Sequence, residues 1–309
     1  MDPGSPGITI GLSCVAAEVL VAMFTNIFII SIILLEFHRT KKLDTKDQIQ
    51  MALKVSSCLF TTVVTYNEFS KVLKPELFKS SHPSLLFAVA IVYSMCSSTW
   101  LVTLQCFFYF FKIVNSKWAF IPWVKRMMDS STSWQIVVVE VMSLGIGLLH
   151  LLLYRTENVS STNSSDIPST NMTPEEMIIH NYVTYPLLIV TCPSLLLSTI
   201  STIITAAFLR GHMIKMKDTN TTGELHQYNR AVRTLLRYLF LYCVFYVMMF
   251  LYYFSFFALH SIGYWINLIL VFLFIPVVNV LQILGTPHLR TTWKEMMSYF
   301  PQCRKPNIH

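Results

Sequence analysis

The sequence predicts an all-α membrane protein: a bundle of seven transmembrane helices followed by a short amphipathic helix. Composition is the first reason, because hydrophobic residues make up 54% of the 309 residues and charged residues only 13%. A soluble domain usually carries about 25% charged residues. The mean hydropathy of +0.54 is the second reason, because a soluble fold cannot bury this much apolar surface. Disordered, fibrous and ordinary cytosolic proteins are therefore excluded.

Seven mostly apolar runs are each long enough to cross the hydrocarbon core as a helix, which takes about 20 residues. Lipid offers no partner to free backbone groups, and the runs are too long and continuous for barrel strands. No Lys or Arg precedes the first run, so we expect a retained helix and not a removed signal peptide. The predicted spans are Ile8–Leu35, Gln48–Tyr66, Ser84–Phe111, Trp134–Tyr154, Asn181–Leu209, Leu235–Leu259 and Ile262–Leu284.

A shorter amphipathic helix is expected over residues 286–300, after the last span. Thr286 can cap its start and Pro287 suits its first position. Apolar residues then follow at helical spacing, which predicts a helix lying on the inner leaflet. Residues 301–309 form a short tail, in which Cys303 is either a palmitoylation site or a free thiol. Residues 1–309 are thus predicted to form a single domain.

The positions of Lys and Arg predict the orientation. With the N-terminus outside, 18 of the 23 lie in the inner loops and tail, 4 lie in outer loops, and Lys54 lies inside the second span. Cytoplasmic loops carry the excess of positive residues. Glycosylation sequons agree, because Asn158, Asn163 and Asn171 all fall in the second outer loop. Asn220 also matches but falls in the third inner loop, so we expect it to stay unmodified.

Three classes of function compete for such a bundle: a ligand-gated receptor, a transporter and a membrane enzyme. No HExxH or GxSxG motif and no aspartate pair in adjacent spans is present, so no enzyme is predicted. The last span contains no Lys for a retinal Schiff base, and the seven spans show no internal repeat of the kind that transporters use. The seven Cys have no metal-ligand spacing, so no metal or cofactor is expected. The net charge of +7 follows the topology and does not indicate a nucleic-acid partner.

The third span ends in WLVTLQCFFYFFKIVN, which matches the pattern W-x-A-T-x-L-S-x-F-Y-F-L-K-I-A. This stretch resembles the bitter taste receptors, the type 2 taste receptor family. Glu18 and Asn26 also have the family's spacing, and LGTPHLR resembles the end of its seventh span. The matching third-span residues are Trp100, Thr103, Phe108, Tyr109, Phe110, Lys112 and Ile113.

The chain is similar to a divergent member of that family. The family's Arg of the second span falls at Ser57, while Lys54 lies one turn earlier, and its seventh-span His-Pro or His-Ser pair falls at Val278 and Asn279. The alternative resemblance is to the type 1 vomeronasal (pheromone) receptors, which have similar inner motifs. A transporter is the remaining alternative.

The resemblance implies a G-protein-coupled receptor of the plasma membrane, with an extracellular N-terminus and a cytoplasmic C-terminus. A small apolar or amphipathic bitter compound would bind the outer half, and the inner ends of the spans would activate a gustducin-type (inhibitory) heterotrimeric G protein. Lys112 and the Arg residues could instead be cations that contact lipid phosphates. The candidate G-protein contacts are Phe108, Tyr109, Lys112, Ile113, Lys215, Arg230, Arg233 and Arg237.

Candidate ligand contacts lie in the outer halves of the second, third, fifth, sixth and seventh spans. Aromatic and Met side chains suit an adaptable apolar pocket with few polar anchors, although each could face lipid instead. Glu68 is the only acid in the set, so we expect cationic ligands to depend on it. The set is Asn67, Glu68, Ile91, Ser94, Met95, Ser98, Tyr182, Tyr185, Ile189, Tyr246, Met249, Phe250, Tyr253, Asn267, Leu268 and Val271.

Polar residues inside the spans predict an interhelical network. A charge near the bilayer centre costs about 3 kcal/mol or more unless it is paired or close to water. Lys54 could substitute electrostatically for the family's missing Arg. The network is either a switch that rearranges on activation or a static hydrogen-bonded cluster. Its expected members are Glu18, Asn26, Lys54, Asn279 and Gln282.

Overall fold

The computed structural model describes residues 6–73, 81–113, 120–161, 174–217, 222–253, 257 and 261–302. In this part of the chain every regular element is a helix, which confirms the predicted fold class. The helices are α1 (Pro6–Thr40), α2 (Thr45–Leu73), α4 (Ser81–Ile113), α5 (Phe120–Ser161), α6 (Pro174–Lys217), α7 (Thr222–Tyr253), α8 (Ile262–Gly285) and α9 (Pro287–Gln302).

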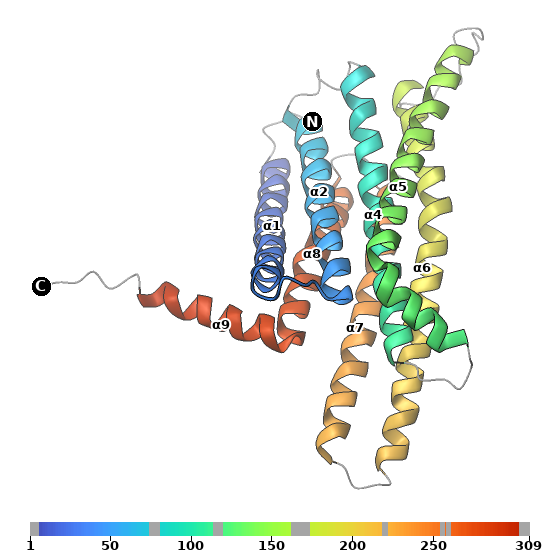
Figure 1. The fold of residues 1–309 in the computed structure, drawn as a ribbon. Helices are drawn as coiled ribbons and strands as arrows, with labels where there is room; N and C mark the ends of the chain where they lie inside the picture. Colours follow the sequence, from blue (N-terminus) through green and yellow to red (C-terminus); the bar gives the residue numbers. More distant parts are fainter. Residues whose placement is uncertain are drawn as a thin grey trace, which may run out of the picture.

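The long helices pack side by side into a bundle, and α9 runs sideways from one end of it (Figure 1). Helix α1 contacts α2 and α8, α2 contacts α4, α4 contacts α5 and α6, and α6 contacts α7, which closes back on α8. Helix α4 therefore lies between three neighbours. We call the end where α9 begins the α9 end, and the opposite end, where α2 finishes and α8 starts, the Glu68 end.

Five of the described helices are long and apolar enough to cross a membrane, and α7 contains a shorter apolar stretch at Leu236–Tyr252. Helix α2 is not among them, and it carries the polar residues Lys54, Asn67 and Glu68. Those three side chains are buried against neighbouring helices. The second predicted span is therefore a helix whose polar groups face protein, as intramembrane polar residues are expected to do. The five helices include Gly7–Thr40, Leu86–Ile113, Ser130–Leu149, Ile189–Gly211 and Ile262–Gly285.

Large apolar side chains cover the outside of the bundle, as a protein dissolved in lipid requires. On α5 alone, Val141 is 63% exposed and Leu152 is 58% exposed. Contiguous apolar surface of this extent would drive association in water. Its presence on the outward faces supports a bilayer as the medium around the helices.

The main core joins α1, α2, α4, α7 and α8. Trp265 of α8 packs against α1 at Gly11, where a Cβ atom would come within 2.4 Å of the indole ring. Only a residue without a side chain permits this approach. Phe245 and Phe274 stack with their ring centroids 4.2 Å apart, which connects α7 to α8.

Helix α9 begins at Pro287, the residue expected at its first position, and continues to Gln302, two residues beyond the expected end. The Arg290 N–H donates to the Thr286 carbonyl across the junction with α8. Trp293 makes edge contacts with Phe24 and Phe28 of α1. These contacts hold the first turns of α9 against the bundle, while Cys303 lies outside the described residues.

Candidate functional site

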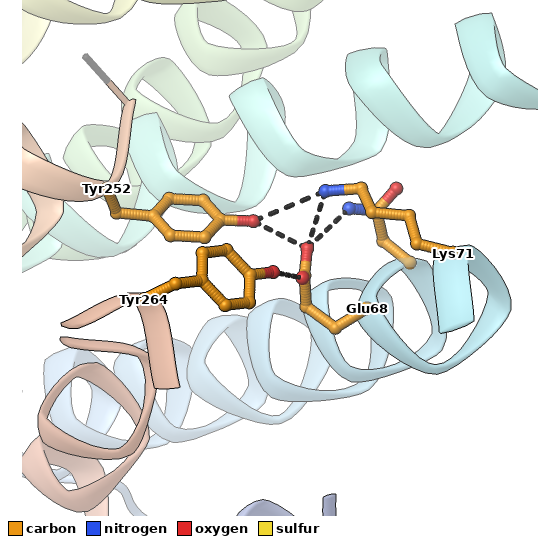
Figure 2. A network of polar contacts seen from close by, with 5 residues as sticks. Glu68, Lys71, Tyr252 and Tyr264 are labelled. Carbon is orange, nitrogen blue, oxygen red and sulfur yellow. Dashed lines mark hydrogen bonds and ion pairs between the residues drawn. The ribbon is translucent and has the colours of Figure 1, made fainter. Parts of the chain in front are cut away.

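A cluster of polar side chains joins three helices at the Glu68 end. It contains Asn67, Glu68 and Lys71 of α2, Tyr252 of α7 and Tyr264 of α8, and we call it the Glu68 cluster. Figure 2 shows both tyrosines pointing at the carboxylate from the opposite side to Lys71. The Ser261 side chain caps α8 by accepting from the Tyr264 N–H, which fixes the start of the helix that carries Tyr264.

Each oxygen of the Glu68 carboxylate is engaged. Oε1 accepts from Asn67 Nδ2 at 2.9 Å, from Lys71 Nζ at 2.7 Å and from the Tyr252 hydroxyl at 2.5 Å. Oε2 accepts from the Tyr264 hydroxyl. Because the side chain is only 3% exposed, these donors replace water and make burial of the charge tolerable. A cationic ligand can reach this carboxylate only by displacing one of its present partners.

A second polar cluster, deeper in the bundle, joins α1, α2 and α8. Lys54 Nζ donates to Asn279 Oδ1 at 2.6 Å. Asn279 Nδ2 lies 2.9 Å from both Thr25 Oγ1 and Asn26 Oδ1. All four side chains are buried, and Lys54 is only 2% exposed. We call this group the Lys54 cluster. In this cluster the Lys54 amino group bonds to an amide oxygen, not to a carboxylate.

Beside Lys54 lies the cavity between α2, α4, α7 and α8. Its volume is about 50 Å³, which is room for a few water molecules and far below the volume of a ligand pocket. Met95, Ser98 and Tyr246 line it together with Lys54 and Asn279. The helices would have to move apart for a drug-sized ligand to bind in this cavity.

The sequence model of the family Taste receptor protein (TAS2R) matches residues 4–300 of the chain. The chain belongs to this family. Relatives include Taste receptor type 2 member 8 of Pongo pygmaeus, 24% identical over 145 residues, and of Gorilla gorilla gorilla, 22% identical over 257 residues. The chain spans 47% of the length of the first relative and 80% of the second. The match to Taste receptor type 2 member 8 of Homo sapiens is 22% identical and again spans 47% of either chain.

The structure of this TAS2R family member brings together three of the five predicted network residues: Asn26, Lys54 and Asn279. Glu18 makes no hydrogen bond to them in the described structure, and its buried Oε2 has no partner there. Gln282 is buried one turn beyond Asn279, with its Nε2 likewise unpartnered. Neither residue therefore bonds to the Lys54 cluster in the described part of the chain.

A third intramembrane charge, Glu140 of α5, is held by α4. Tyr93 donates to one carboxylate oxygen at 2.7 Å, and Ser97 donates to the other at 2.8 Å. These bonds connect α4 to α5. Lys54, Glu68 and Glu140 thus each have a hydrogen-bond partner on another helix.

Most of the predicted ligand residues that the structure describes are buried in the packed core, not in an open pocket. Met95, Met249, Leu268 and Val271 belong to the main core, and Ile91 and Tyr246 pack against it. Asn67, Glu68, Ser94 and Asn267 are buried as well, and Ser98 lies at the cavity.

Two predicted ligand residues lie on the outside of the bundle instead. Ile189 is 73% exposed and Phe250 is 47% exposed. Both therefore face the surroundings, where lipid is the expected contact. The side chains of Tyr182, Tyr185 and Tyr253 lie outside the described residues.

The predicted G-protein contacts lie at the α9 end, on α4, α6 and α7. Phe108 is buried beside Ile49 of α2, and the Lys112 ammonium lies 5.2 Å from its ring centroid. Arg233 and Arg237 are exposed. Tyr109 and Ile113 are half-buried at the same end, and the side chains of Lys215 and Arg230 lie outside the described residues. Asn163 and Asn171 lie outside the described residues, and Asn158 lies in α5, where its side chain is not described.

Sequence reasoning missed the partners that complete each cluster: Thr25, Lys71, Tyr252 and Tyr264. Lys71 could have been found, because it follows Glu68 by three residues, a spacing that pairs side chains on a helix. The two tyrosines could not, because an aromatic residue near a span end is also typical of the membrane interface.

Proposed function

We propose that this protein is a bitter taste receptor of the plasma membrane. A small apolar or amphipathic compound binds toward the Glu68 end and shifts the helices, and the α9 end activates a gustducin-type (inhibitory) heterotrimeric G protein. The family match over residues 4–300 carries this proposal. Any agonist acts by binding the active arrangement more tightly than the inactive one.

The basic α9 end supports the proposed coupling. Exposed Arg233 and Arg237 on α7 lie at the same end as exposed Lys112 on α4. A cationic surface there suits both the inner leaflet, which is anionic, and acidic groups of a protein partner. The inner excess of Lys and Arg, 18 against 4, supports placing this end in the cytoplasm.

Cells that express the receptor with a gustducin-type chimeric α-subunit are expected to give a calcium response to some members of a mixed set of bitter compounds. The same cells without the chimera are expected to give none. Responses limited to pheromone-like steroids would favour a vomeronasal type of receptor. Solute flux without the G protein would overturn the proposal in favour of transport.

Removing the three sequons of the second outer loop (Asn158→Gln, Asn163→Gln and Asn171→Gln together) is expected to abolish the mobility shift that a glycosidase produces on gels. Asn220→Gln is expected to change nothing, because Asn220 is placed in the cytoplasm and glycan transfer occurs on the other side. A glycan at Asn220 would contradict the proposed orientation.

A further inference from the structure

The Lys71 ammonium group lies in a site whose neighbouring groups are those that bind organic cations. The nitrogen lies 2.7 Å from the buried Glu68 carboxylate and 3.4 Å from the Tyr252 hydroxyl. It also lies 5.9 Å from the centroid of the Tyr252 ring. A carboxylate beside an aromatic ring is a common arrangement for recognising organic cations. Figure 2 shows Lys71 and Tyr252 meeting at the Glu68 carboxylate.

The two partners of this ion pair differ in exposure. The Glu68 side chain is 3% exposed, whereas the Lys71 side chain is 34% exposed. The carboxylate is fixed from α2, α7 and α8 by Asn67 and the two tyrosines. Lys71 lies three residues further along α2, and its withdrawal gives up its contact with the Tyr252 hydroxyl but leaves the bonds of Asn67, Tyr252 and Tyr264 to Glu68 in place.

We propose that Lys71 is a tethered occupant of a binding site for cationic ligands. A ligand with a primary ammonium group next to an apolar body displaces the Lys71 nitrogen and binds Glu68, while Tyr252 and Tyr264 stay in place. This inference deepens the proposed function by naming the ligand class, and it rests on that function only for the claim that such ligands are agonists.

The tether determines how tightly such a ligand binds. A cation attached by a short flexible linker competes at an effective concentration on the order of millimolar. An external ammonium compound must exceed that competition, so the native receptor responds to cations weakly. Without the Lys71 charge, the Glu68 carboxylate has no tethered cation competing for it. The affinity for external ammonium groups is therefore expected to rise about tenfold or more.

The test uses the purified full-length receptor, with benzylammonium as the probe and benzyl alcohol as its neutral counterpart. The rise in thermal unfolding midpoint is measured against probe concentration for the native protein and for Lys71→Met. Benzylammonium is expected to act on Lys71→Met at concentrations about tenfold lower than on the native protein. Benzyl alcohol is expected to act equally on both. Lys71→Gln serves the same purpose if Lys71→Met does not fold.

Two control variants separate charge from shape. Lys71→Arg keeps a cation in the site and is expected to resemble the native protein. Lys71→Met combined with Glu68→Gln removes the carboxylate as well and is expected to lose the gain. The proposal is overturned if Lys71→Met shows no gain, if the gain is equal for benzyl alcohol, or if it survives Glu68→Gln.

This measurement does not involve a G protein, so it tests the cation site independently of the proposed function. A gain in binding without any calcium response to bitter compounds would leave the cation site standing and overturn the receptor assignment. A calcium response in cells together with no gain for Lys71→Met would do the reverse.

Discussion

Asn279→Leu is expected to lower the free energy of unfolding by about 1–3 kcal/mol, because it leaves the buried Lys54 amino group without its hydrogen-bond acceptor. The amide oxygen of Asn279 lies 2.6 Å from Lys54 Nζ, and the side chains of the cluster are shielded from water. The loss is expected as a lower thermal unfolding midpoint of the solubilised receptor and as reduced surface expression in cells.

The double variant Lys54→Met with Asn279→Leu provides the control. It removes the polar group of Lys54 together with its acceptor, so that two apolar side chains pack against each other. It is therefore expected to recover the larger part of the stability lost in Asn279→Leu. Lys54→Met alone leaves one amide oxygen unpartnered, which costs about 1–3 kcal/mol. Strictly additive losses across the cycle would mean that Lys54 and Asn279 are not energetically coupled.

Lys54→Met is expected to abolish signalling while leaving the receptor at the cell surface, if the Lys54 cluster is the switch. The ammonium connects α2 to α8, and Asn279 connects α8 onward to Thr25 and Asn26 of α1. A buried charge that has different partners in the active and inactive arrangements of the helices contributes to the free-energy difference between those arrangements. Replacing it with an apolar chain of similar length removes that difference at modest cost in stability.

The measurement is the calcium response to an agonist at matched surface expression. Lys42→Met is the matched control, because Lys42 is exposed and lies outside the cluster, and its response is expected to equal that of the native receptor. A normal response of Lys54→Met would instead assign the cluster a static structural role, which is the other interpretation of the same hydrogen bonds.

Part of the Lys54 cluster could be predicted from the sequence, because polar residues in otherwise apolar spans must find one another. Lys54 and Asn279 are 225 residues apart in the chain, yet both lie in apolar spans, where a polar side chain needs a partner from another helix. Thr25 escaped prediction because a threonine can satisfy its own hydroxyl within a helix, and Thr25 does so by also donating to the Val21 carbonyl.

Glu68 illustrates the opposite case. As the only acid among the candidate ligand contacts, it was predicted to bind a ligand cation directly, and the structure surrounds it with Tyr252 and Tyr264 from α7 and α8. Local sequence at α2 carries no information on which residues of α7 and α8 lie opposite. The carboxylate's present partners depend on how those helices are rotated and how far each is shifted along its axis.

The sequence by itself determined that the chain spans a bilayer, how many apolar runs it has, which end of the bundle is basic, and where α9 begins. Tertiary structure alone decided that Ile189 and Phe250 face outward, that the cavity beside Lys54 is small, and that Tyr252 and Tyr264 reach the Glu68 carboxylate. The physical reason is the solvent. In water a helix shows its inner face by its apolar stripe, but in lipid both faces are apolar, so only close packing and polar contacts between helices distinguish them.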